Sequence, residues 1–122
     1  MSRHLLPESE VHESVRDHVA SLNRDIVDEV HAAVRAHDVV VVGMAQNPSC
    51  KKARRFFEAR DDDFRYLEYG SYLGEWRRRL ALKMWTGWPT FPMVFVKGQL
   101  VGGHDDLVKL AGSGELDRLL KA

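Results

Sequence analysis

The spacing of apolar residues first predicts two helices between residues 8 and 36, with a break at Asn23. Charged residues fill the positions between the apolar ones, which is typical of a solvated face, and a role in dimer contacts is the alternative. The apolar positions form two stripes: Val11, Val15, Val19 and Leu22, then Ile26, Val27, Val30, Ala33 and Val34.

Four short stretches then predict strands, at residues 39–42, 64–69, 93–96 and 100–101. The first run is unbroken valine, which favours a strand buried on both faces. Helices are expected at about 48–60 and 72–86, and a last helix starts near Asp105 and divides at residues 112–114. This order of strands and helices along the chain requires a right-handed parallel crossover between the first two strands and then a hairpin between the last two. We therefore expect an α/β fold, with a small mixed four-stranded sheet flanked by helices.

Composition narrows the function classes. The chain has 122 residues, enough for one domain with a modest core. Its formal net charge is +0, so no overall field favours nucleic acid or an anionic membrane. No apolar run approaches the roughly 20 residues of a membrane span. The N-terminal stretch MSRHLLPESEVHES lacks the apolar region of a signal peptide, so a cytoplasmic location is expected.

One cysteine excludes a disulfide within the chain and a cysteine-rich zinc site, so a redox cycle would need a partner thiol. It lies in the stretch NPSC. Asn47 is the predicted N-cap of the following helix, Pro48 its first residue and Cys50 its third. On one interpretation Cys50 packs on an apolar stripe with Ala53 and Phe57. On the other, the helix dipole and nearby basic residues lower its pKa and make it reactive.

Two later stretches are candidate binding segments. In GWPTFPMVFV, a cis Phe91–Pro92 bond would present the Phe91 backbone to an extended peptide. In VGGHDD, glycines precede a helix start whose free N–H groups suit a carboxylate. A rigid turn and a helix cap without a ligand are the alternatives.

From about Asp38 to Leu119 the sequence resembles the glutaredoxin family, and its monothiol branch most closely. VVVVGMAQNPSCKKARRFF is similar to the first strand, active-site turn and helix of that family, and WPTFPMVFVKGQLVGGHDDL to its second half. The resemblance implies a thioredoxin-like fold at residues 38–122, with residues 1–37 as an N-terminal helical extension. It also implies a glutathione site formed by Arg79, Lys83, Thr90, Phe91, Pro92, Gly103, His104 and Asp105.

Within that site, Arg79 and Lys83 match a basic pair that holds a glutathione carboxylate. Residues 90–92 match the turn that pairs with the tripeptide backbone. Residues 103–105 match the segment that receives the γ-glutamyl end, where Asp105 would take the amine.

The active-site turn departs from the family pattern. Aligning Phe56 and Phe57 with the paired apolar residues of the family places Asn47 at the nucleophilic cysteine and Cys50 at the fourth position. A carboxamide cannot form a mixed disulfide. A shifted alignment would make Cys50 the nucleophile, but it spoils the helix stripe. Met44 stands where the family has a basic residue, so one carboxylate anchor is missing.

Three functions remain open from the sequence. The first is a monothiol oxidoreductase that uses Cys50 on glutathionylated proteins. The second is a homodimeric carrier of a [2Fe-2S] cluster for iron–sulfur client proteins, with Cys50 the only protein ligand from each chain and no other metal site. The third is a module that binds glutathione or a peptide without chemistry. The displaced cysteine favours the third function over full activity.

Overall fold

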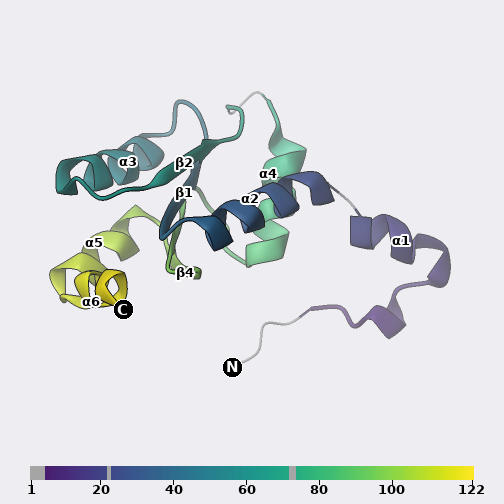
Figure 1. The fold of residues 1–122 in the computed structure, drawn as a ribbon. Helices are drawn as coiled ribbons and strands as arrows, with labels where there is room; N and C mark the ends of the chain where they lie inside the picture. Colours follow the sequence, from purple (N-terminus) through teal and green to yellow (C-terminus); the bar gives the residue numbers. More distant parts are fainter. Residues whose placement is uncertain (1–4, 22, 72–73) are drawn as a thin grey trace.

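The computed structural model of the protein describes residues 5–21, 23–71 and 74–122. A mixed sheet lies at the centre with helices on both faces (Figure 1). In chain order the elements are η1 (Glu8–Glu10), α1 (Glu13–Ser21), α2 (Arg24–Ala36), β1 (Val39–Gly43), α3 (Pro48–Arg60), β2 (Arg65–Glu68), α4 (Trp76–Thr86), β3 (Met93–Val96), β4 (Gln99–Gly102), α5 (His104–Gly112) and α6 (Glu115–Lys121).

The sheet has the order β2-β1-β3-β4. β1 and β2 are parallel and joined through α3, with Val42 opposite Leu67. β1 and β3 are antiparallel, with Val42 opposite Met93, and β3 and β4 form a hairpin. The predicted crossover, hairpin and four-stranded mixed sheet are therefore confirmed.

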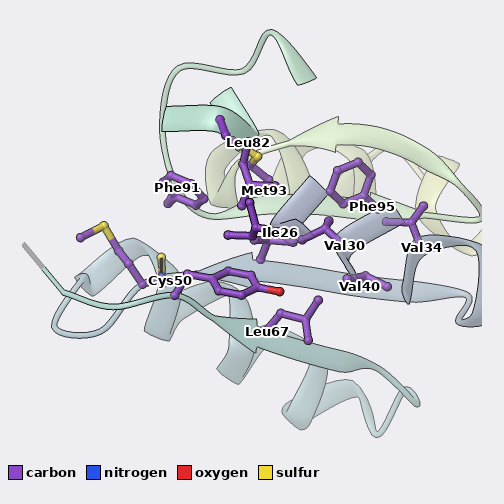
Figure 2. Packing of buried hydrophobic residues seen from close by; sticks show 14 residues of the cluster. Ile26, Val30, Val34, Val40, Cys50, Leu67, Leu82, Phe91, Met93 and Phe95 are labelled. Carbon is purple, nitrogen blue, oxygen red and sulfur yellow. Dashed lines mark hydrogen bonds between the residues drawn. The ribbon is translucent and has the colours of Figure 1, made fainter. Parts of the chain in front are cut away.

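Alternation along β1 divides the core into two clusters. Val40 and Val42 face the side covered by α2 and α4, where they pack with residues such as Ile26 and Leu82 (Figure 2). Val39 and Val41 face the side covered by α3, α5 and α6. Every residue of β1 is buried, as the valine run predicted.

Some element bounds differ from those expected. The N-terminal stretch begins with the short turn η1 before α1, and the break at Asn23 occurs where expected, with φ at +48°. α4 begins at Trp76 rather than at residue 72, because Glu75 just before it has a left-handed φ of +59°. The first two residues of the predicted helix, 72 and 73, lie outside the described residues.

The hydrophobic core crosses the predicted domain boundary at residue 37. α2 contributes Ile26, Val30 and Val34 to the same cluster as Val40 and Phe95. By contrast, none of the described side chains of α1 is buried, and α1 lies away from the sheet (Figure 1). The division into 1–37 and 38–122 stays a prediction, and α2 packs as an integral helix of the fold.

No helix within residues 5–21, 23–71 and 74–122 is both long enough and apolar enough to cross a membrane.

Candidate binding pocket beside the start of α3

The start of α3 has the capped geometry that NPSC predicted. Asn47 has extended backbone angles, and its Oδ1 accepts a hydrogen bond from the backbone N–H of Cys50 at 2.9 Å. Pro48 occupies the first helical position, where a missing N–H costs nothing. The Asn47 carboxamide therefore acts as a helix cap.

Cys50 lies on the inner side of this first turn. Its exposed fraction is 0%, and Figure 2 shows it within the cluster that α2 and α4 cover. The Met44 backbone N–H points at its Sγ at 3.5 Å. Burial is the largest influence on the thiol and raises its pKa, outweighing the Met44 N–H, which lowers it.

An exposed Cys50 with a lowered pKa was the condition for a reactive thiol, and the structure does not meet it. The helix dipole and the neighbouring lysines do not outweigh desolvation, because Lys51 and Lys52 are exposed while the sulfur is buried. The geometry agrees with the packing interpretation. Met44, which stands where the resemblance to the family expects a basic residue, is itself buried.

Gly43, Tyr66 and Cys50 pack closely behind the turn. A Cβ atom on Gly43 would lie 2.6 Å from the Tyr66 hydroxyl and 3.1 Å from the Cys50 Sγ. That hydroxyl donates to Glu68 Oε1 at 3.3 Å, and burial is the main cause that raises the Tyr66 pKa. A side chain at position 43 would require the Tyr66 hydroxyl and the Cys50 thiol to shift, and the glycine allows the thiol to pack against the strand.

The loop after α4 has the cis Phe91–Pro92 bond that the sequence suggested. The Phe91 ring is buried, and Lys83 Nζ lies 5.7 Å from the ring centroid. Thr86 Oγ1 accepts from the Trp88 N–H at 3.1 Å, which ties the start of the loop to the end of α4.

The segment before α5 also has the predicted geometry. Gly102 has a φ of +109°, and a Cβ there would lie 2.6 Å from Asp106 Oδ2. The same oxygen accepts from the Gly103 N–H at 3.1 Å. Asp106 therefore caps this end of α5, and the Asp105 side chain is exposed beside His104.

These two segments and the start of α3 meet around one pocket of about 150 Å³. It is lined by Ser49, Trp88, Thr90, Phe91, Pro92, Gly103, His104, Asp105 and Asp106. The volume is below the roughly 300 Å³ of pockets for drug-sized ligands, so it suits one end of an extended molecule. Six of the predicted glutathione residues line it: Thr90, Phe91, Pro92, Gly103, His104 and Asp105.

The other predicted residues lie elsewhere. Lys83 lies beside the Phe91 ring, and neither Lys83 nor Cys50 is among the residues that line the pocket. Arg79 is buried, and its Nη1 donates to the backbone carbonyls of Tyr69 and Gly74. The expected carboxylate anchor thus holds the chain before α4 in place, and the structure does not bring it to the pocket.

Three lining residues were not nominated from the sequence: Ser49, Trp88 and Asp106. Ser49 and Trp88 belong to the quoted motifs NPSC and GWPTFP, so their position was a usable signal. Trp88 Nε1 is buried and has no hydrogen-bond partner within the described residues. A buried N–H without an acceptor is uncommon and makes a donor available at this place.

Metal-ligating side chains do not gather here. In the part of the chain that the structure describes, no group of three or more His, Cys, Asp or Glu residues is placed to hold a metal ion.

The comparisons with known proteins agree with this fold. The glutaredoxin family model matches residues 39–101. A glutaredoxin-like protein of Dictyostelium discoideum is 42% identical over 109 residues, which cover 89% of each chain. A probable monothiol glutaredoxin, GrlA, of Legionella pneumophila is 34% identical over 82 residues, covering 65% of this chain and 89% of that protein. This chain belongs to the glutaredoxin family.

A solved structure of a buckwheat glutaredoxin–glutathione complex superimposes with a TM-score of 0.70. It covers 83% of this chain and 92% of that one, at 21% sequence identity. At that identity the likeness shows the thioredoxin-like fold.

Proposed function

We propose that this protein binds glutathione in the pocket between the loop after α4 and the start of α5, and that Cys50 takes no part in thiol chemistry. One observation carries the proposal: six predicted glutathione residues line one pocket, while the only thiol of the chain, that of Cys50, is buried and does not line it. The buckwheat relative of the same fold is described in complex with glutathione, which supports this choice of ligand.

The chemistry of the pocket suits the γ-glutamyl end of the tripeptide. Backbone N–H groups at the start of α5 can take a carboxylate, aided by the helix dipole. The exposed Asp105 carboxylate can accept from the ammonium group. Lys83 supplies a cation beside Phe91 for the other end. Since the pocket is small and open, affinity in the millimolar range is expected.

Titration calorimetry with glutathione tests the binding. We expect Lys83→Met to weaken binding by about three- to tenfold, because it removes the half-buried cation beside Phe91. Lys109→Met, on α5 and away from the pocket lining, is the matched control and should bind like wild type. Absence of heat at millimolar glutathione would contradict the proposal.

A glutathione-coupled disulfide reductase assay tests the role of Cys50. Wild type and Cys50→Ser should give the same low rate, because the buried thiol cannot be attacked or attack. Asn47→Cys places a sulfur at the cap position that the alignment equates with the family nucleophile. Activity that appears in Asn47→Cys alone would support an intact groove without a nucleophile. Activity of wild type that Cys50→Ser abolishes would overturn the non-catalytic assignment.

The residues of this chain do not fit the iron–sulfur carrier that was considered from the sequence. Such a cluster needs a thiolate that faces a partner, and the Cys50 sulfur is fully buried with a raised pKa.

A further inference from the structure

Two helices of this chain present apolar rows of the same spacing, and both rows are left uncovered. On α4, Trp76, Leu80 and Met84 follow at intervals of four residues and are all exposed. On α1, Val15 and Val19 have the same interval and are exposed; these two residues are called the valine stripe. Residues four apart form the ridges that pack into the grooves of a second helix.

The α4 row borders a hollow surface. A groove of about 430 Å³ lies between α2 and α4, with Val27 and His31 on one side and Met84 and Trp85 on the other. A second hollow of about 250 Å³ continues along Trp76, Leu80 and Met84. Together, these residues of α2 and α4 are called the α2/α4 groove. Soluble proteins rarely leave several large apolar side chains exposed side by side without a partner.

Charge distinguishes the two rows and makes them complementary. Segment 5–21 carries four carboxylates, those of Glu8, Glu10, Glu13 and Asp17, and one arginine, a formal charge of −3. α4 carries three arginines and one lysine and no acidic residue. Of these, Arg77 is exposed beside the apolar row and stacks over Trp76. Arg78 already pairs with Asp25, Glu29 and Glu75 of its own chain, and Arg79 is buried. Arg77 is therefore the exposed cation that this face of α4 offers to the acidic segment.

The path of the chain favours a second molecule as the source of the covering helix. α1 lies beyond the start of α2 and away from the sheet (Figure 1). Of its two exposed valines, Val19 lines the groove of its own chain together with Val27 and Met84, and Val15 is not among the lining residues. A second copy can cover both rows while each chain keeps the conformation of the structure. A two-fold dimer would form two such contacts, which doubles the area buried.

We propose that the protein forms a reciprocal homodimer in which segment 5–21 of each copy docks its valine stripe on the α2/α4 groove of the other. This interface is separate from the glutathione pocket. The exposed row of α4 does not include Lys83, which contacts Phe91, and no residue lines both the groove and the pocket.

Sedimentation equilibrium of the full chain, from micromolar to millimolar concentration, tests the proposal. We expect a monomer–dimer equilibrium that weakens with added salt. Val15→Asp and Met84→Asp should each raise the dissociation constant by at least about tenfold, because each buries a charge in an apolar contact. Val108→Asp is the control, since Val108 on α5 has the same 45% exposure as Val15. It should leave the constant unchanged.

Mixing the two variants tests reciprocity. The Val15→Asp chain keeps an intact groove, and the Met84→Asp chain keeps an intact segment, so one native contact forms between them. The mixed dimer should therefore be tighter than either variant alone. A monomer at every concentration would overturn the proposal. A dimer weakened by only one of the two substitutions would also overturn it. In that case the valine stripe would pair with a second valine stripe, or the groove with a second groove. Circular dichroism of each variant checks that the fold is kept.

Discussion

The amide oxygen of Asn47 binds the N–H of Cys50, and the Met44 N–H points at the sulfur of the same residue. These contacts give the turn two separate tasks. Asn47 caps the N-terminus of α3, and the buried Cys50 side chain packs beneath that first turn. In this chain the turn is thus a helix cap above an apolar contact.

The cap can be tested by substitution at Asn47. Asn47→Ala leaves the Cys50 N–H without its side-chain acceptor, so the free energy of unfolding should fall by about 1 kcal/mol. Urea unfolding measures this. Asn47→Asp keeps an acceptor next to the helix dipole and should lose much less. Equal losses in the two variants would show that the carboxamide oxygen does not stabilise the turn.

Burial of Cys50 predicts a pH-dependent stability. The folded-state pKa is raised, whereas the unfolded chain has an ordinary thiol pKa of about 8.5. The thiol therefore contributes its full stability below about pH 8.5, and this is lost as pH rises towards the folded-state pKa.

Unfolding of wild type and Cys50→Ala, at pH values from about 7 to 10 in reductant, measures this contribution. The advantage of wild type should shrink above about pH 8.5, by up to about 1.4 kcal/mol for each pH unit. Tyr66, the tyrosine next to Cys50, stays protonated in the folded state over this range, because burial raises its pKa. Parallel pH profiles would contradict a raised thiol pKa.

At the scale of elements, the two halves of α4 make different contacts. Its N-terminal half holds the preceding chain through Arg79, whose guanidinium donates to the carbonyls of Tyr69 and Gly74. Its C-terminal half supplies Lys83 and leads into the pocket loop. Two basic residues on one helix face therefore have different tasks.

Substitution at these two positions separates the tasks. Arg79→Met leaves two carbonyls without their donor, so stability should fall by about 1–3 kcal/mol. Glutathione affinity of the folded protein should change little. Lys83→Met should show the reverse: weaker binding with stability nearly unchanged. A loss of affinity in Arg79→Met as large as in Lys83→Met would return Arg79 to the binding site.

The elements were largely predictable because their signals are local. The valine run of β1, the cap at Asn47 and the glycines before α5 each act within a few residues. The burial of Cys50 was not predictable, because it depends on Gly43 and Tyr66 from other elements. The position of Arg79 depends on carbonyls five and ten residues earlier in a turn without a hydrophobic pattern.

At the scale of the whole molecule, the core determines what can be removed. α2 places Ile26 and Val30 against β1 and β3 with almost no exposed surface, whereas α1 has no described side chain in the core. A chain that begins at residue 23 should keep its cooperative unfolding. A chain that begins at residue 38 should lose it, because two or three large side chains leave the core at about 2–4 kcal/mol each.

Circular dichroism and urea unfolding of both truncated chains check this expectation. A folded 38–122 chain would show that the core does not need α2. An unfolded 23–122 chain would show that the N-terminal segment contributes more than its exposure indicates.

The single buried thiol has a practical consequence for anyone who handles this protein. Because Cys50 is the only cysteine and has no exposed surface, an aromatic disulfide reagent can label it only when the chain opens. The labelling rate under native conditions then reports the population of open molecules, read from one atom without an engineered probe. Chain concentration should slow that rate if a partner binds the closed form, so one colorimetric time course can measure that association.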